Sequence, residues 1–254
     1  MIQFARYAPY LAARGHRVSL IVIPTLVELF HSLKGIQRVI ATPFKPREEK
    51  GPICWLPLMS VPHVLGLAED DLRADVPYLA AEPARVAVWA KRLGAHGFKI
   101  GIAWQGNPKY TDDEKRSIPL AEFAPLAEIA GVRLISLQLG SGSDQIENVA
   151  FRDRIETLGE AFDAGPSSFL DTAAVMTRLD LVVISDTSIA HLAGALARPA
   201  FVALARVPDW RWLLDRDDSP WYPSLRLFRQ SAPGDWPGVF ARIAEAVREL
   251  AGRG

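Results

Sequence analysis

The sequence of 254 residues is short of several features that mark common classes of protein. It has one cysteine, Cys54, which excludes an intrachain disulfide and a cysteine-rich metal site. Lysine and arginine together number 29, as do aspartate and glutamate, so the charge balance gives no reason to expect nucleic acid or an anionic membrane as a partner. No apolar run approaches the length that a membrane-spanning helix needs.

Several motifs of catalysis and cofactor binding are also missing. There is no Gly-x-Gly-x-x-Gly or Walker-type loop, which argues against a dinucleotide-dependent enzyme and against an NTPase. There is no Gly-x-Ser-x-Gly elbow, and no His, Asp and Glu cluster at metal-site spacing, so we expect neither metal nor cofactor. The first residues do not read as a signal peptide, because Arg6 and Pro9 interrupt the apolar stretch, and we expect a cytoplasmic protein.

What the chain does have is an alternation of apolar runs with amphipathic segments. The runs predict strands, and the segments between them predict helices. The predicted strands are 18–23, 38–40, 53–58, 100–104, 132–137, 155–158, 181–184, 200–204 and 224–228; the predicted helices are 2–14, 25–33, 83–93, 119–129, 168–179, 188–197 and 236–250. This pattern predicts an α/β protein with parallel sheets. We expect two Rossmann-like domains, 1–75 and 83–254, joined by a charged, proline-containing linker at 70–82.

The stretch 181–204 carries the clearest chemical signal. A short apolar strand is followed by Ser185, Asp186, Thr187 and Ser188, and then by a helix that Pro199 terminates. The turn between them lies at the carboxyl end of a parallel strand, where open α/β sheets place their ligands. The free amides and the positive dipole end of a helix N-terminus favour phosphate there.

His191 strengthens this signal because it lies four residues after Thr187 and three after Ser188, on the same helix face. If His191 donates to a phosphate, its protonated form should bind more tightly, and affinity should fall as pH rises. A plainer interpretation also exists: Thr187 or Ser188 caps the helix, and His191 only packs.

Other candidates follow two neighbouring predicted strands: Gln105, Gly106 and Asn107 after 100–104, and Gln138 after 132–137. Lys109 and Arg116 are the cations best placed to offset the charge of a diphosphate, unless they belong to a solvated charged loop, as we expect for Lys115. The tryptophans of 209–222 can stack on a base or a sugar, although such clusters are more often core.

Together the motifs resemble a known family. The segments GIAWQGNP, RSIPL, ISLQ, SDTSIAHLAGALARP and PDWRWLLDRDDSPWYPSLRLFRQ resemble the glycosyltransferase-like domain that follows tetratricopeptide repeats in many bacterial proteins. That domain is similar to heptosyltransferases and, more distantly, to O-linked N-acetylglucosamine transferases. The resemblance implies a GT-B fold, in which two Rossmann-like domains face a cleft. It also places Asp186, Thr187, Ser188 and His191 on a D-T-[SG]-x-x-H motif that meets the donor's diphosphate.

The sequence departs from this family at its start. In relatives a strand and a GLGD loop precede the first helix, and the aspartate of that loop is the proposed catalytic base. Here Met1 stands immediately before the helix, so we expect an N-terminal domain that lacks its first strand, and the catalytic residue stays unassigned.

The resemblance therefore implies an inverting, metal-independent glycosyltransferase. It would move a sugar from a nucleotide-diphosphate donor to an unknown acceptor, protein or glycan. The alternative is a catalytically weak or inactive domain that binds nucleotide or a partner protein.

Overall fold

The computed structural model describes residues 1–44, 53–68, 76–111 and 113–252. Its larger part is a six-stranded parallel sheet with the strand order β5-β4-β3-β6-β7-β8. The strands are β3 (Phe98–Ala103), β4 (Val132–Ser136), β5 (Ile155–Glu156), β6 (Leu181–Ser185), β7 (Ala200–Leu204) and β8 (Leu225–Arg229). The chain runs outward from β3 to β5 and then crosses back to β6. The strand order therefore reverses between β3 and β6, which is where open sheets of this kind bind ligands.

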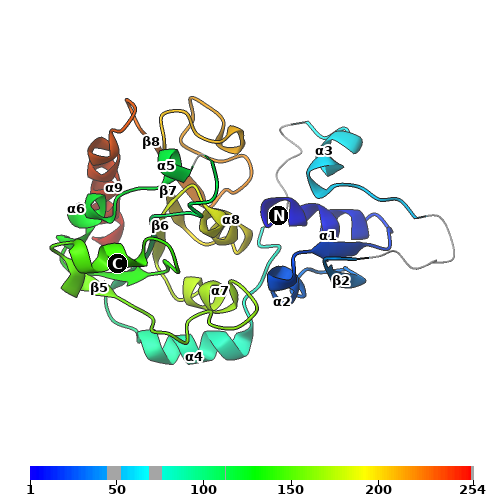
Figure 1. Ribbon diagram of the computed structural model, residues 1–254, viewed down its shortest axis with the longest axis horizontal. Coiled ribbons are helices and arrows are strands. Elements are labelled where there is room, and N and C mark those ends of the chain that lie inside the picture. Colours follow the sequence, from blue (N-terminus) through cyan, green and yellow to red (C-terminus); the bar gives the residue numbers. More distant parts are fainter. Residues whose placement is uncertain (45–52, 69–75, 112, 253–254) are drawn as a thin grey trace.

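Helices cover both faces of this sheet, as Figure 1 shows. On the side of the N-terminal elements lie α4 (Pro83–Leu93), α7 (Leu170–Met176) and α8 (Ser188–Ala195); α6 (Ala124–Ala127) and α9 (Trp236–Ala251) lie on the other side, and α5 (Asp113–Arg116) follows β3. Strand β6 is apolar at nearly every position because both of its faces are covered by helices. Val182 and Ile184 pack into the cluster with α8, whereas Leu181 and Val183 pack into the cluster with α9.

The N-terminal part is smaller. A 3₁₀ turn, Gln3–Arg6, leads into α1 (Tyr7–Ala12), and these are followed by β1 (Ser19–Val22), α2 (Val27–Phe30), β2 (Arg38–Ala41) and α3 (Val61–Val64). Strands β1 and β2 pair in parallel as a two-stranded sheet within the described residues. The predicted missing strand and the division into two domains stay predictions.

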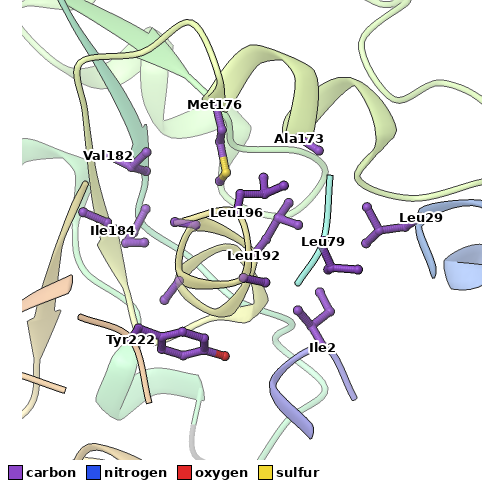
Figure 2. Packing of buried hydrophobic residues seen from close by; sticks show 14 of the residues in the cluster. Ile2, Leu29, Leu79, Ala173, Met176, Val182, Ile184, Leu192, Leu196 and Tyr222 are labelled. Atoms are coloured by element: carbon purple, nitrogen blue, oxygen red, sulfur yellow. The ribbon is translucent and has the colours of Figure 1, made fainter. Parts of the chain in front are cut away.

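One apolar core joins the two parts of the chain. Figure 2 shows Ile2, Leu29 and Leu79 near Leu192 and Tyr222, and all five belong to one cluster of buried residues. The backbone amides of residues 78 and 79 also donate to the carbonyl at the end of α8. The start of the chain therefore packs directly on the helix that carries the candidate site.

The predicted strand 53–58 is wrong. Residues 53–57 are irregular, and a 3₁₀ turn, Leu58–Ser60, follows them. The side chains of Ile53 and Trp55 are about half exposed, so this apolar run is neither paired in a sheet nor buried. Pro57 lacks the amide that a central strand would need. The predicted linker 70–82 lies partly outside the described residues.

No helix in the described part of the chain combines the length and the apolar character needed to cross a bilayer.

Candidate functional site

The pairing of β3 with β6 brings two of the predicted polar loops together. Ala103 and Ile184 are register partners at the carboxyl ends of these strands. A side chain joins the loops: Nη1 of Arg116 donates to the backbone carbonyl of Asp186 at 3.2 Å, and its Nε donates to Oδ1 of Asp113 at 3.0 Å. Arg116 is therefore an oriented cation beside the turn that follows β6, rather than part of a solvated loop.

Gly106 makes this position of Arg116 possible. A Cβ on Gly106 would lie 2.6 Å from Nη2 of Arg116 and would also overlap the carboxylate of Asp113. The amide of Gly106 donates to Oγ of Ser117 at 3.3 Å, and Ser117 donates to Asp113 at 2.9 Å. The glycine predicted from sequence therefore lets the loop after β3 pack closely on its own cation.

The N-terminus of α8 keeps unused hydrogen-bonding groups. Thr187 is the N-cap residue in extended conformation, but neither it nor Ser188 provides a side-chain cap. The hydroxyl oxygens of Ser185 and Thr187 are buried without a hydrogen-bond partner in the described structure. Counting from the start of α8, the first backbone amide with a backbone acceptor is that of Ala190, which donates to the carbonyl of Thr187. The amides of Ser188 and Ile189 precede it and have no intrahelical acceptor. The interpretation that Thr187 or Ser188 merely caps the helix is therefore wrong.

His191 lies one turn further along α8 and is held on two sides. Its ring stacks on Trp212, with centroids 5.2 Å apart and planes 6° apart, and its Nδ1 lies 3.2 Å from the phenol oxygen of Tyr222. Burial, with smaller contributions from Arg211, the chain's N-terminal ammonium group and Arg6, lowers the pKa of His191 to about 3. The ring is neutral near pH 7, so the prediction of a protonated histidine at a phosphate does not fit this structure.

The carboxylate of Asp186 lies in the same surroundings. Burial raises the pKa of this carboxylate, and the negative charge of Asp209 raises it further. The indole N–H of Trp212 and the cations Arg116 and Arg211 lower the pKa, each by less than burial raises it. The backbone carbonyl of Asp186 accepts from Arg116 at 3.2 Å.

Gln138 has a different role from the one predicted, because backbone groups use its whole amide. Its Oε1 accepts from the amides of Trp104 and Gln105, each at 3.0 Å, and its Nε2 donates to the carbonyls of Gln105 and Ser141. Gln138 therefore fixes the loop after β3 to the loop after β4. The side chain of Gln105 is likewise engaged, since its Oε1 accepts from Gln145 at 3.0 Å.

Asn107 and Lys109 lie further out. Both are exposed, and Oδ1 of Asn107 accepts from the amide of Lys109 at 3.0 Å, which forms a local turn. A cavity of about 630 Å³ opens beside this loop, and Gln105, Lys109 and Tyr110 line it with eight other residues. None of the α8 residues lines that cavity. The predicted residues thus form two neighbouring groups, one at the cavity and one at the N-terminus of α8.

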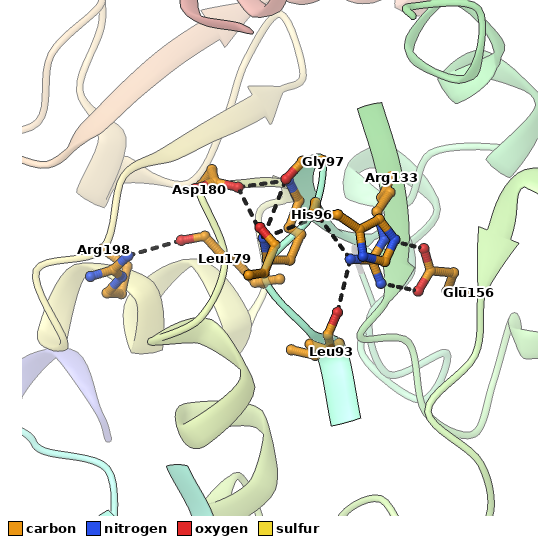
Figure 3. Close-up of polar contacts among 10 residues, drawn as sticks. Leu93, His96, Gly97, Arg133, Glu156, Leu179, Asp180 and Arg198 are labelled. Carbon is orange, nitrogen blue, oxygen red and sulfur yellow. Dashed lines mark hydrogen bonds and ion pairs between the residues drawn. The ribbon is translucent and has the colours of Figure 1, made fainter. Parts of the chain in front are cut away.

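Charged residues also gather at the amino ends of the strands, as Figure 3 shows, but their groups bind each other and the main chain. Arg133 holds Glu156 through two contacts of 2.7 Å and also donates to the carbonyl of Leu93. The carboxylate of Asp180 accepts from the amide of Lys99 at 2.7 Å. Among the described residues no group of three His, Cys, Asp or Glu is placed to hold a metal ion.

Sequence reasoning missed four residues that shape the site. Asp113 orients Arg116, while Trp212 and Tyr222 hold His191. Arg6 is almost fully buried, with its guanidinium 4.6 Å from the ring centroid of Tyr222. The concentration of aromatics in 209–222 was a signal for Trp212 and Tyr222. Nothing in the pattern indicated that an arginine in the first helix is buried.

Comparisons with known proteins bear on the fold and on the part of the chain that contains this site. Residues 90–204, which contain β3, β6 and α8, match the model of Glycosyltransferase family 9 (heptosyltransferase). Among curated proteins the chain is similar to Protein FlbA of Caulobacter vibrioides, at 31% identity over 182 residues, or 68% of this chain; it spans 29% of the length of that protein.

Solved structures show the same fold. The ADP-heptose LPS heptosyltransferase II of E. coli gives a TM-score of 0.64 at 11% identity, covering 99% of this chain and 95% of that one. A family 9 glycosyltransferase from Veillonella parvula gives 0.66 at 12% identity, covering 99% and 94%. E. coli heptosyltransferase WaaC with ADP gives 0.54 at 13% identity, covering 100% and 95%. The expected GT-B-type α/β fold with a parallel sheet, and the resemblance to heptosyltransferases, are thereby confirmed.

Proposed function

We propose that this chain is a glycosyltransferase domain that binds the diphosphate of a nucleotide-sugar donor at the N-terminus of α8. The observation that carries the proposal is the set of unused groups there. Two buried hydroxyls, of Ser185 and Thr187, and two amides, of Ser188 and Ile189, have no partner within the described protein. Buried polar groups are normally hydrogen-bonded, so unpaired groups at one helix end, with Arg116 held at the same turn, favour an anionic ligand.

In this proposal each group has a task in the transfer. The acceptor's hydroxyl attacks the anomeric carbon, the bond from that carbon to the diphosphate oxygen breaks, and the sugar inverts. Negative charge then grows on the leaving diphosphate, where the helix amides and Arg116 stabilise it. His191, neutral near pH 7, supplies a hydrogen bond rather than a charge. The acceptor and the group that takes its proton are unassigned.

The family 9 match over 90–204 and the heptosyltransferase fold support this assignment. We place the nucleoside side of the donor near Gln105, Asn107 and Lys109, at the cavity beside the loop after β3. Gly106 and Gln138 serve by shaping that loop.

One observation favours the alternative of a domain that binds donor without transferring the sugar. The N-terminal segment packed against α8 brings Gln3 and Arg6 to it, and neither can act as a general base at neutral pH. Binding of donor without detectable turnover would support this second function.

The test is calorimetry with ADP, UDP and GDP and their sugar derivatives. Replacing Ser185→Ala together with Thr187→Val removes both unpaired hydroxyls and leaves the sequence of α8 unchanged. We expect the best ligand to bind about 1–3 kcal/mol more weakly. Thr177→Val is the matched control, because it removes a hydroxyl that bonds within α7, away from the site. Equal affinities in the double variant and the wild type, with both folded, would refute the proposal.

A further inference from the structure

We propose that Tyr222 is a positioning residue for His191: its phenol donates to Nδ1 and holds the imidazole as the tautomer that carries its proton on Nε2. This inference deepens the proposed function and rests on it for the identity of the ligand. The Nε2–H group would be the donor that His191 offers to an anion at the N-terminus of α8.

The contact that carries the inference is the hydrogen bond between the side chains of His191 and Tyr222. The phenol oxygen of Tyr222 lies 3.2 Å from Nδ1 of His191. Tyr222 is fully buried, while His191 is partly exposed. Nδ1 is thus the inner ring nitrogen, and Nε2 makes no hydrogen bond within the described residues. Trp212 stacks on the ring and prevents it from turning to exchange the two nitrogens.

The direction of this hydrogen bond follows from the groups behind Tyr222. The oxygen of Tyr78 lies 3.4 Å from that of Tyr222, and its own proton is directed to the carbonyl of Ile2 at 3.2 Å or of Gln3 at 3.4 Å. The guanidinium of Arg6 lies 4.6 Å from the ring centroid of Tyr222 and 5.0 Å from that of Tyr78.

A guanidinium can only donate, so Arg6, which lies over the rings of Tyr78 and Tyr222, offers no acceptor to the phenol proton of Tyr222. Of the acceptors within reach of the Tyr222 phenol, Nδ1 of His191 at 3.2 Å is nearer than the oxygen of Tyr78 at 3.4 Å. Burial raises the pKa of Tyr222 well above its ordinary value, so this phenol keeps the proton that it donates.

The tautomer decides what His191 can bind. A neutral imidazole has one N–H and one bare nitrogen. With the proton on Nε2, the ring edge that does not contact Tyr222 offers a donor to phosphate oxygens. With the proton on Nδ1, the same edge would present a lone pair and repel them. His191 shares a helix face with Thr187 and Ser188, so its ring lies on the side of α8 where we place the diphosphate.

The first experiment measures the tautomer directly. In the full chain labelled with ¹⁵N, long-range ¹H–¹⁵N correlation spectra separate protonated from bare ring nitrogens, and His191→Gln identifies the signals of His191. We expect the Nε2–H form in the wild type and a mixture of tautomers in Tyr222→Phe. Tyr10→Phe, which removes a phenol remote from His191, should leave the spectrum of the wild type unchanged. An Nδ1–H form in the wild type, or an unaltered tautomer in Tyr222→Phe, would overturn the inference.

The second experiment connects the tautomer to binding. Calorimetry with ADP and UDP should show affinity about two- to tenfold lower in Tyr222→Phe, and no further loss when Tyr222→Phe is added to His191→Gln. An additional loss in that double variant would mean that Tyr222 acts other than through His191, against the inference.

If His191→Gln leaves affinity unchanged while the tautomer shifts as expected, the positioning role stands and the proposed diphosphate contact fails. Should Tyr222→Phe not fold, the wild-type spectrum alone decides the tautomer.

Discussion

The imidazole of His191 and the indole of Trp212 lie parallel, with centroids 5.2 Å apart and planes within 6°. The two residues come from different elements, α8 and the 3₁₀ turn Trp210–Trp212 that follows β7. Stacking of this kind stabilises a pair beyond the area that it buries. It makes the tryptophan-rich segment a support for the candidate site instead of a separate part of the core.

Arg116 should matter for ligand binding more than for folding. Because its charge lies partly exposed beside the turn after β6, we expect Arg116→Gln to weaken binding of nucleoside diphosphates by about 1.5–3 kcal/mol. Titration calorimetry of the two proteins measures this. Arg152→Gln removes a cation that is more than half exposed and distant in the chain, and should change little. Comparable losses in the two variants would show that only the overall charge matters.

His191 should make the protein less stable in acid. The folded protein takes up its proton only near pH 3, whereas the unfolded chain takes one up near 6.5, so acidification through this window favours unfolding. We expect this residue to reduce the free energy of unfolding by about 1–2 kcal/mol between pH 7 and pH 5.

The measurement is urea unfolding at several pH values, with His191→Gln compared to the wild type. The variant should show the smaller loss in acid. Asp186, whose raised pKa acts in the opposite sense, is present in both proteins, so their difference isolates His191. His31→Gln, at an exposed histidine, should behave as the wild type, and an identical slope in His191→Gln would contradict the prediction.

Gly194 should not tolerate a side chain. A Cβ there would overlap the buried ring of Tyr222, so we expect Gly194→Ala to destabilise the protein by about 1–3 kcal/mol. Thermal unfolding followed by circular dichroism checks this. Gly165→Ala is the matched control, because its added Cβ would meet no atom within 4 Å. A melting temperature for Gly194→Ala equal to that of the control would show that Tyr222 can move aside.

The N-terminal sheet should open more readily than the larger one. Strands β1 and β2 form a two-stranded sheet within the described residues, and small sheets of this kind are only marginally stable. We expect amide hydrogens of 19–22 and 38–41 to exchange faster than those of β3 and β6. Hydrogen exchange with mass spectrometry resolves these peptides, and equal protection in β1 and β6 would count against the prediction.

The sequence predicted the larger sheet well, because its central strands, such as β6 and β7, are short apolar runs bounded by turn residues. Val182 and Ile184 face one layer and Leu181 and Val183 the other, so β6 had to be apolar at every position. The same reasoning failed at 53–58, where an apolar run stays at the surface. Local composition does not reveal whether a partner strand exists.

For the candidate site, the sequence predicted which loops meet but not what each side chain does. Asp186, Thr187, Ser188 and Arg116 lie together because β3 and β6 are neighbours. Gln138 looked equally suited to a ligand, yet the main chain uses its amide. The contacts of His191 with Trp212 and Tyr222 span 21 and 31 positions, and such pairings depend on tertiary packing that no local pattern encodes.

The burial of Arg6 bears on how this molecule can move. Its guanidinium is enclosed by Tyr78, Trp221 and Tyr222, and it donates to the carbonyl of Trp221 at 2.8 Å. Pulling residues 2–8 away from the larger part would expose apolar surface and break those contacts together. We therefore expect the first helical turn to move with the larger part if the N-terminal part moves away from it. A ligand-bound structure in which Arg6 leaves Trp221 would disprove this. A hinge between the two parts would then lie after residue 8. Residues 2–8 would move with the larger part, although they come first in the chain.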